Sequence, residues 1–199
     1  MSDDGQLPTL ICIIGAPAVG KMTVGQALCA RTGYKLFHGH VVADLLSPYF
    51  PFGTPEFVRF GHTLRRMFIE EAQSAGLNLV TTVAWRFDLP GDADAIWSWL
   101  RPYLDNGRVI FPELVAPVDV RRERNRTENR HRHKNPYWVT DDYLRDMNAK
   151  HRYDSGGTLP FDVPHLRLET EHLAAEDTAD RIIDHFGLPQ LDGPRGTTS

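Results

Sequence analysis

Apolar and polar residues follow one another along this 199-residue chain in two patterns, one continuous and one periodic. Continuous apolar runs predict strands that are buried on both faces of a sheet. The predicted strands lie at residues 9–15, 31–37, 77–85, 108–118 and 164–170. Segments whose apolar residues recur every three or four positions predict amphipathic helices. The predicted helices lie at residues 21–30, 41–46, 56–75, 92–104, 140–152 and 174–186.

Strands that alternate with helices indicate an α/β fold, in which helices cover both faces of a parallel sheet. We expect one folded domain over residues 9–187, because the chain length suits a single core. Residues 1–8 and 188–199 are expected to be flexible. No apolar run approaches the roughly 20 residues that cross a bilayer. Because the acidic N-terminus also differs from a signal peptide, we expect a cytoplasmic protein without a membrane partner.

Two of the predicted helices carry apolar stripes that we assign to the core rather than to a substrate pocket. In helix 56–75 the stripe consists of Phe57, Phe60, Leu64, Phe68 and Ala72. In helix 92–104 it consists of Ile96, Trp97 and Leu100.

A phosphate-binding loop is predicted where the first strand meets the first helix. Gly15 is followed after four residues by Gly20 and Lys21, which is the spacing of such a loop. Glycines let the backbone curl so that successive N–H groups face one anion, and the helix N-terminus adds partial positive charge. Lys21 would supply a cation for the terminal phosphates. We therefore assign nucleotide binding to Gly15, Ala16, Pro17, Ala18, Val19, Gly20, Lys21, Met22 and Thr23.

Met22 stands where such loops usually carry a Ser or Thr that coordinates Mg²⁺. Thr23 carries the nearest hydroxyl, but neighbouring helical positions point roughly 100° apart, so Thr23 is only a weak metal candidate. Either Mg²⁺ is held by phosphates, water and a carboxylate, or the loop binds nucleotide with weak catalysis. We favour the first interpretation, because Mg²⁺ readily keeps several waters.

Positive charge is concentrated in segment 121–134, where six Arg and one Lys face two Glu, in a chain whose net charge is −4. This imbalance indicates a local anion site rather than a general affinity for nucleic acid. Arg122, Arg126 and Arg130 are spaced four apart, so on a helix they share a face. Planar guanidinium groups stabilise the charge that phosphoryl transfer spreads over oxygen atoms. A basic helix exposed to solvent is the alternative.

The sequence resembles the P-loop kinases of small molecules and nucleotides, the group that includes shikimate kinase, adenylate kinase and chloramphenicol phosphotransferase. The motifs that carry the resemblance are GAPAVGKMT (15–23), LFHGHVVADLL (36–46) and VRRERNRTENR (120–130). The resemblance implies a three-layer sandwich with a five-stranded parallel sheet in the order 2-3-1-4-5 and an arginine-rich lid at about 122–139. It also implies ATP and Mg²⁺ as cofactors. By position, Arg126 and Arg130 match the lid arginines that contact the transferring phosphate, and Arg122 matches the arginine that stacks on adenine.

The acceptor site is expected beyond the second and third strands, because α/β sheets bind ligands at the carboxyl ends of their strands. His40 follows the second strand where related kinases often carry an Asp, and we favour it as the general base, oriented by Asp44 one turn later. Asp44 alone as the base, a structural His40, or a hydrogen bond from His40 to the substrate are the alternatives. Residues assigned to substrate binding are His38, Arg59, Trp85 and Arg86.

Together these features predict an ATP-dependent phosphotransferase that moves the γ-phosphoryl group to a hydroxyl of a metabolite, nucleoside or antibiotic. Its catalytic residues would be Lys21, His40, Asp44, Arg126 and Arg130. A nucleotide-binding regulator or slow NTPase is the first alternative, and Met22 favours it. A polynucleotide kinase is a weaker alternative that rests on the arginine run alone.

Overall fold

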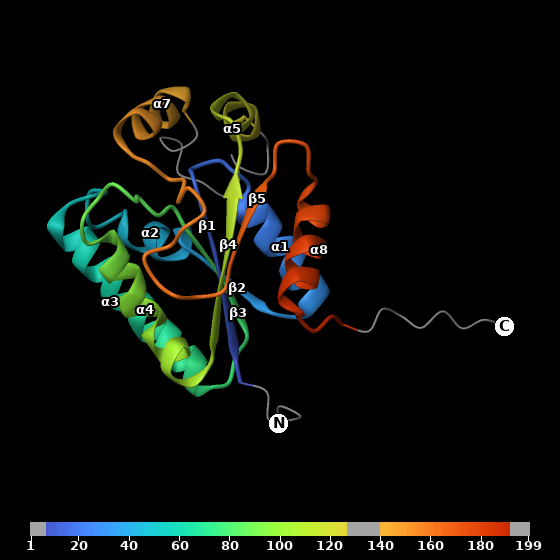
Figure 1. Ribbon diagram of the computed structural model, residues 1–199. Coiled ribbons are helices and arrows are strands. Elements are labelled where there is room, and N and C mark those ends of the chain that lie inside the picture. The colour runs from blue at the N-terminus through green and yellow to red at the C-terminus, as the bar shows by residue number, and fades with distance from the viewer. Residues whose placement is uncertain (1–6, 127–139, 192–199) are drawn as a thin grey trace.

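Five parallel strands form one sheet in the order β2-β3-β1-β4-β5 (Figure 1). The computed structural model describes residues 7–126 and 140–191. The strands are β1 (Thr9–Gly15), β2 (Lys35–His38), β3 (Leu79–Val83), β4 (Arg108–Val115) and β5 (His165–Glu169). β1 lies at the centre, paired with β3 and β4, and it is buried along its whole length. The predicted α/β class, parallel sheet and strand order are confirmed.

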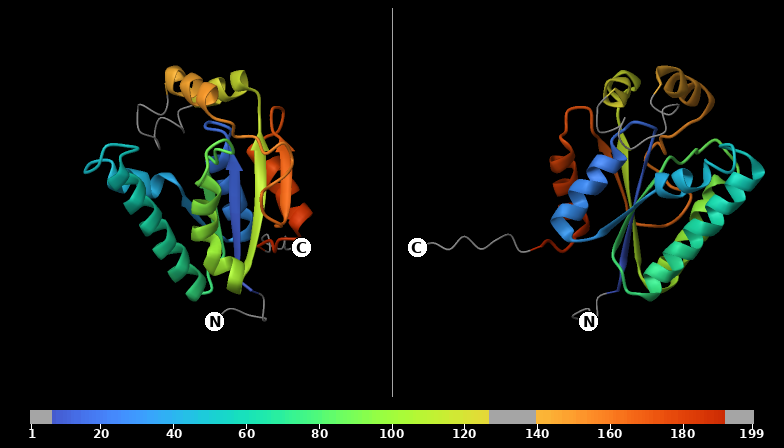
Figure 2. Two further views of the ribbon diagram at one scale, coloured as in Figure 1. Left: turned by 60° about the vertical axis from the view of Figure 1, so that its left-hand side comes forward. Right: turned by 180° about the vertical axis from the view of Figure 1, so that it is seen from behind.

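Helices cover both faces of the sheet, so the molecule has three layers (Figure 2). The helices are α1 (Lys21–Thr32), α2 (His40–Leu46), α3 (Pro55–Ser74), α4 (Asp92–Asn106), α5 (Val118–Asn125), α7 (Asp141–Lys150) and α8 (Ala175–Phe186). α1 and α8 pack together on one face, and α3 and α4 pack together on the other. α5 and α7 lie beyond the carboxyl ends of the strands (Figure 1). Most of the predicted lid, residues 127–139, falls outside the described residues.

The described chain continues past α8 into the segment that we assigned to a flexible tail. Leu188 is buried in the core, and the Leu191 N–H donates to the Arg31 carbonyl oxygen at 2.7 Å. Residues 188–191 are therefore attached to the domain. Within 7–126 and 140–191, no helix has the length and apolar character that crossing a bilayer requires.

The buried stripe of α3 differs from the predicted one. Phe57 is buried as predicted, but Phe60 and Phe68 are exposed. Their rings stack on Phe50 and Phe37, respectively. The buried stripe is narrower than the sequence pattern because α3 packs mainly on α2 and α4 and leaves its other flank to solvent.

On α4 the core tryptophan is Trp99 rather than Trp97, which corrects the predicted stripe. Trp97 is partly exposed and stacks on Phe161, with 4.0 Å between the ring centroids. Helical spacing alone could not separate the two residues, because both lie next to the line through Ile96 and Leu100. The difference matters for function, because Trp99 also lines the cavity described below.

A buried carboxylate on β4 fastens the segment that crosses the sheet between α7 and β5. Glu113 is fully buried and accepts hydrogen bonds from the backbone N–H of Ser155 at 2.8 Å and from the Ser155 hydroxyl. His165 Nε2 lies 2.9 Å from Glu113 Oε2. These contacts hold the segment from which Tyr153 reaches the cavity.

Candidate active site

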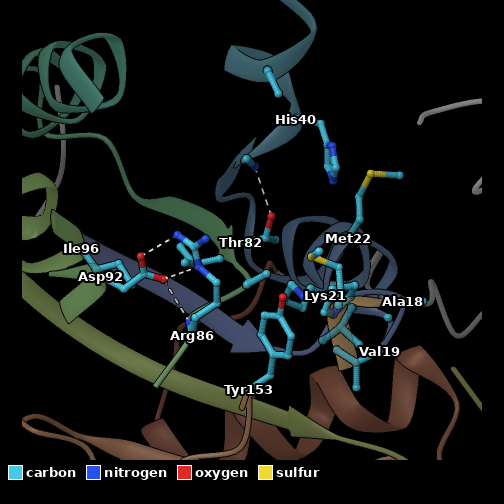
Figure 3. A pocket seen from close by; sticks show the side chains of 18 of the residues that line it. Ala18, Val19, Lys21, Met22, His40, Thr82, Arg86, Asp92, Ile96 and Tyr153 are labelled. Atoms are coloured by element: carbon cyan, nitrogen blue, oxygen red, sulfur yellow. Dashed lines mark hydrogen bonds and ion pairs between the residues drawn. The ribbon is translucent and has the colours of Figure 1, made fainter. Parts of the chain in front are cut away.

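A cavity of about 750 Å³ lies at the carboxyl ends of β1, β2 and β3, where the sheet topology predicts a ligand site. One half is formed by the loop after β1, by Arg124 and by residues 170–178, and we call it the nucleotide half after the prediction from the sequence. The other half is formed by residues from α2, α3, α4 and the ends of β2 and β3, and we call it the acceptor half for the same reason. Figure 3 shows side chains from both halves around the same space.

The loop between β1 and α1 has the backbone that the sequence predicts for phosphate binding. A Cβ on Gly15 would lie 2.3 Å from the Leu114 carbonyl oxygen, so only glycine fits there. Gly20 has φ +109°, and Ala18 has φ +65°, which is uncommon for a residue with a side chain. These torsions curl the chain directly before α1, whose first residue is Lys21. The loop therefore combines a curled backbone, a helix N-terminus and a lysine.

Three cations engage the carbonyl oxygens of this loop. Lys21 Nζ donates to Gly15 O at 2.6 Å and to Ala16 O at 2.7 Å. Arg121 Nη1 lies 3.4 Å from Pro17 O, and Arg124 Nη1 lies 2.9 Å from Val19 O. Because the N–H of a trans peptide points away from its C=O, the held carbonyls of Gly15, Pro17 and Val19 direct the following N–H groups to the opposite side of their peptide planes. The peptide of the Ala16 carbonyl contributes no N–H, because Pro17 follows it.

Arg124 is the arginine of α5 that reaches the nucleotide half of the cavity. Its guanidinium contacts Val19 and also donates to Thr170, from Nη1 to the hydroxyl at 3.2 Å and from Nη2 to the carbonyl. Thr170 lines the cavity together with Leu173, Ala175 and Thr178. This small pocket of apolar and hydroxyl groups beside a guanidinium suits a planar base better than it suits phosphate.

The arginines that the sequence singled out, Arg122 on α5 and Arg126 at its C-terminal cap, lie elsewhere. Arg122 Nη2 and Arg126 Nη2 both contact Asp141 Oδ2, at 3.1 and 2.6 Å, and all three side chains are partly exposed to solvent. Neither arginine lines the cavity. Arg130 lies outside the described residues.

His40 lies where the two halves of the cavity meet. It begins α2 and lines the cavity, next to Gly39, whose N–H donates to the Thr82 hydroxyl at 3.2 Å (Figure 3). Asp44 lies on the exposed side of α2, outside the cavity lining. His38 also lies outside the lining, with its ring centroid 6.1 Å from that of His40. The structure therefore brings His40, but not Asp44 or His38, to the space above Lys21.

Arg86 does reach the acceptor half, where Asp92 holds it. Arg86 Nε donates to Asp92 Oδ2 at 2.8 Å, and Nη2 donates to Oδ1 at 2.6 Å (Figure 3). The hydrogen bonds that Arg86 donates to Asp92 raise the pKa of Arg86 and outweigh the opposing effect of burial. Trp85 is only 1% exposed and belongs to the core, and Arg59 is exposed on α3 outside the lining.

Residues of this half that sequence reasoning missed include Arg65 on α3 and Trp99 on α4. Arg65 Nη2 donates to the Gly39 carbonyl oxygen at 2.8 Å, and its guanidinium carbon lies 5.1 Å from the Trp99 ring centroid. The signal was present in the sequence, because Phe57, Gly61 and Arg65 are spaced four apart and so lie on one line of the helix. Gly61 leaves room on that line where another side chain would fill the cavity.

The described lining offers little to a protein-bound Mg²⁺ ion. Asp92 is the sole carboxylate among the described lining residues, and both of its oxygens contact Arg86. Met22 supplies a thioether, which is a soft ligand, whereas Mg²⁺ prefers oxygen ligands. Thr23 lines the cavity with its side chain exposed. These residues do not fit a metal held by the protein, so Mg²⁺ that arrives with ATP would be held by phosphates and water.

No known protein family and no curated protein matches this sequence, whereas solved structures do. A Chloroflexus aurantiacus protein is 22% identical, with a TM-score of 0.61, over 92% of this chain and 98% of its own. The chain has the fold of the P-loop kinases. A Janibacter sugar kinase is 14% identical, with a TM-score of 0.61, and the match spans 91% of this chain and 95% of the kinase. The tunicamycin resistance protein of Deinococcus radiodurans is 17% identical, with a TM-score of 0.59, and the match spans 94% of this chain and 99% of that protein. At these identities the likeness to P-loop kinases is one of fold.

Proposed function

We propose that the protein is an ATP-dependent phosphotransferase that moves the γ-phosphoryl group of ATP to a hydroxyl of a small molecule. The observation that carries the proposal is the continuity of the cavity, which runs from the phosphate-binding loop to the ends of β2 and β3. A site for nucleotide alone would need only the first half. The second half offers an acceptor a place beside the terminal phosphate.

In the proposed reaction, Lys21 and backbone N–H groups of the loop 15–21, to which Pro17 contributes none, bind the phosphates, and the pocket beside Arg124 binds the base. The acceptor oxygen forms a bond to the γ-phosphorus while the bond from phosphorus to the β–γ bridging oxygen breaks. The hydroxyl proton passes to the imidazole of His40, and ADP leaves. Lys21 would exchange its contacts with Gly15 O and Ala16 O for phosphate oxygens.

Two exposed arginines, Arg122 on α5 and Arg126 at its C-terminal cap, have a proposed role that depends on movement. Arg126 and Arg122 are held by Asp141 at the start of α7, beyond the carboxyl ends of the strands. A triphosphate would compete with this one carboxylate for Arg126, because phosphate oxygens also accept charge-assisted hydrogen bonds from a guanidinium. Arg126 and Arg130 are therefore kept as proposed contacts of the transferring phosphate.

The proposal is tested with γ-labelled ATP and Mg²⁺ against a panel of alcohols, nucleosides, hydroxy acids and antibiotics. A labelled small molecule that forms with the wild-type protein, and not with Lys21→Ala, supports a phosphotransferase. The Lys21→Ala variant is a suitable control, because it removes the cation that donates to the Gly15 and Ala16 carbonyl oxygens of the phosphate-binding loop. ATP binding without any labelled product across the panel would contradict the proposal.

A nucleotide-binding regulator or slow NTPase remains the second candidate. Met22, and a described lining whose single carboxylate contacts Arg86, favour it, because catalysis of phosphoryl transfer usually uses a well-placed metal ion. Binding to oligonucleotides that falls steeply with salt concentration would instead favour a polynucleotide kinase.

A further inference from the structure

The acceptor half of the cavity has more positive charge than the carboxylates among its described lining residues can balance. Arg65 and Arg86 both line it, and Asp92 is the sole carboxylate among the described lining residues. Asp92 uses both oxygens on Arg86, at 2.6 and 2.8 Å. Arg65 is thus left without an acidic partner in the described part of the chain, and the charge of the site points to an anionic ligand group.

Arg65 is held in place but keeps most of its hydrogen-bonding capacity. Arg65 Nη2 donates one hydrogen bond to Gly39 O at 2.8 Å, which uses one of the five N–H groups of the guanidinium. The side chain is partly buried, and burial lowers the pKa of Arg65 to about 10, so the group remains a cation at neutral pH. A partly buried cation is costly without a counter-ion, and a bound carboxylate would relieve that cost.

A buried donor without an acceptor lies beside Arg65. Trp99 is only 8% exposed, and its indole N–H is buried without an acceptor. Buried indole N–H groups normally find an acceptor, so this one indicates a missing ligand or water. His62 packs edge-on to the Trp99 ring at 5.1 Å. Burial, followed by the charge of Arg65, lowers the pKa of His62, so the imidazole is neutral and adds no positive charge at pH 7.

Much of the remaining wall of this half is apolar, with Phe57, Val58, Val83 and Ile96 among its residues, and its further polar groups include the hydroxyls of Thr82, Tyr143 and Tyr153. Such a wall binds a hydrophobic body well. It binds a sugar or polyol poorly, because several hydroxyls would need carboxylate or amide partners. The described lining has no carboxylate free of Arg86 and no Asn or Gln side chain to serve them.

We propose that the phosphoryl acceptor is an amphipathic hydroxy acid, whose anionic group binds Arg65 and whose apolar body lies against Phe57, Ile96 and Trp99. The hydroxyl of this acid points toward His40 and receives the γ-phosphoryl group in the reaction proposed above. The inference rests on the proposed phosphotransferase function, because it names the acceptor class of the same site. An acceptor of this class would distinguish this protein from enzymes that phosphorylate sugars.

Isothermal titration calorimetry with three probes tests the inference in the presence of a non-hydrolysable ATP analogue. The probes are 4-(hydroxymethyl)benzoate, its uncharged amide 4-(hydroxymethyl)benzamide, and gluconate as an anionic polyol. We expect the benzoate to bind at least about tenfold more tightly than the amide, the effect of a charge-assisted hydrogen bond, and more tightly than gluconate. Equal binding of acid and amide, tighter binding of gluconate, or no binding of the acid would each overturn the inference.

Matched arginine variants then locate the anion. Arg65→Gln keeps an amide N–H for Gly39 O but removes the charge, and Arg66→Gln removes an equal charge from the exposed neighbouring position. We expect the acid-to-amide preference to fall to about one in Arg65→Gln and to stay unchanged in Arg66→Gln. If Arg65→Gln does not fold, Arg65→Lys and Trp99→Phe replace it, and each is expected to reduce the preference several-fold. A preference that stays at the wild-type value in these variants would refute the inference.

Failure of the acceptor class and failure of the enzyme function give different results. Transfer of label to gluconate or to the amide as readily as to the acid would support the phosphotransferase function but refute the proposed acceptor class. Selective binding of the acid, together with ATP binding but no transfer to any alcohol, would support the anion site and refute the proposed phosphotransferase function.

Discussion

Arg124 Nη1 donates a hydrogen bond of 2.9 Å to the carbonyl oxygen of Val19, and this contact ties helix α5 to the phosphate-binding loop. The same guanidinium also holds Thr170, on the segment that leads into α8. One side chain therefore fixes two sides of the proposed nucleotide pocket relative to each other. Burial lowers the pKa of Arg124, which nevertheless stays protonated at any pH of interest.

We expect Arg124→Ala to weaken ATP binding about tenfold, because the variant loses a cation beside the base and the hydrogen bonds that join Val19 of the loop to Thr170. Arg122→Ala should change the affinity less than about twofold, because its exposed pair with Asp141 is weak. A fluorescence titration with a labelled ATP analogue measures both constants. A larger loss in Arg122→Ala would instead favour the assignment of adenine stacking to Arg122.

His40→Ala should lower kcat by about 10² to 10³ if the imidazole takes the acceptor proton. Asp44→Ala should stay within about twofold of wild type, because Asp44 is exposed and lies outside the cavity lining. Steady-state kinetics with a saturating acceptor compare the two variants. Normal turnover in His40→Ala, with loss of turnover in Asp44→Ala, would reverse the assignment of the base.

Met22→Thr should lower the Mg²⁺ concentration that gives half-maximal turnover by several-fold. The variant supplies the hydroxyl that P-loop enzymes place on the metal, where the present chain has a thioether. Titration of turnover with Mg²⁺ at fixed ATP measures the shift. The companion variant Thr23→Ala tests the nearest hydroxyl, and an unchanged Mg²⁺ dependence would remove Thr23 from the metal site.

Glu113→Ala should destabilise the protein by about 3 kcal/mol, because His165 and Ser155 lose their buried partner. Burial raises the pKa of Glu113, but hydrogen bonds from His165 and Ser155 outweigh it, and the net effect is a lowered pKa. A carboxyl with a lowered folded-state pKa stabilises the fold above its unfolded pKa, about 4.3, and loses that contribution as pH falls below this value.

Urea unfolding at pH 7 and below pH 4 measures this contribution. The wild type should lose stability over this interval, and Glu113→Gln should lose less, because the amide cannot titrate. An equal loss in both proteins would show that other carboxyl groups cause the acid sensitivity.

The strands and helices were predictable because each depends on neighbours in the sequence. β1 begins and ends as its apolar run predicts, and α3 and α7 begin after Thr54 and Thr140, whose side chains accept from the helix backbone. Glycines 15 and 20 identified the phosphate-binding loop for the same reason. The order of the strands was implied only by the resemblance to P-loop kinases, which the sheet confirms.

The acceptor site was less predictable, because chain segments far apart in the sequence form it. Among the arginines of α3, Arg59 was chosen from the sequence, yet Arg65 faces the cavity. Spacing placed Arg65 on the line of Phe57 and Gly61, but the sequence did not show that this line of the helix faces a cavity. Trp85 and Trp99 differ in the same way: both are buried aromatic residues, but Trp99 also lines the cavity.

By itself, the sequence determined the alternation of strands and helices, the loop that curls around Lys21, and the concentration of cations after β4. Tertiary structure decided which cations meet in the cavity. Arg65 lies 26 residues from Gly39, and Arg124 lies 105 residues from Val19, so neither contact leaves a local pattern. Secondary structure follows from hydrogen bonds and burial within a few residues, whereas the charge of a site depends on which distant side chains the packed layers bring together.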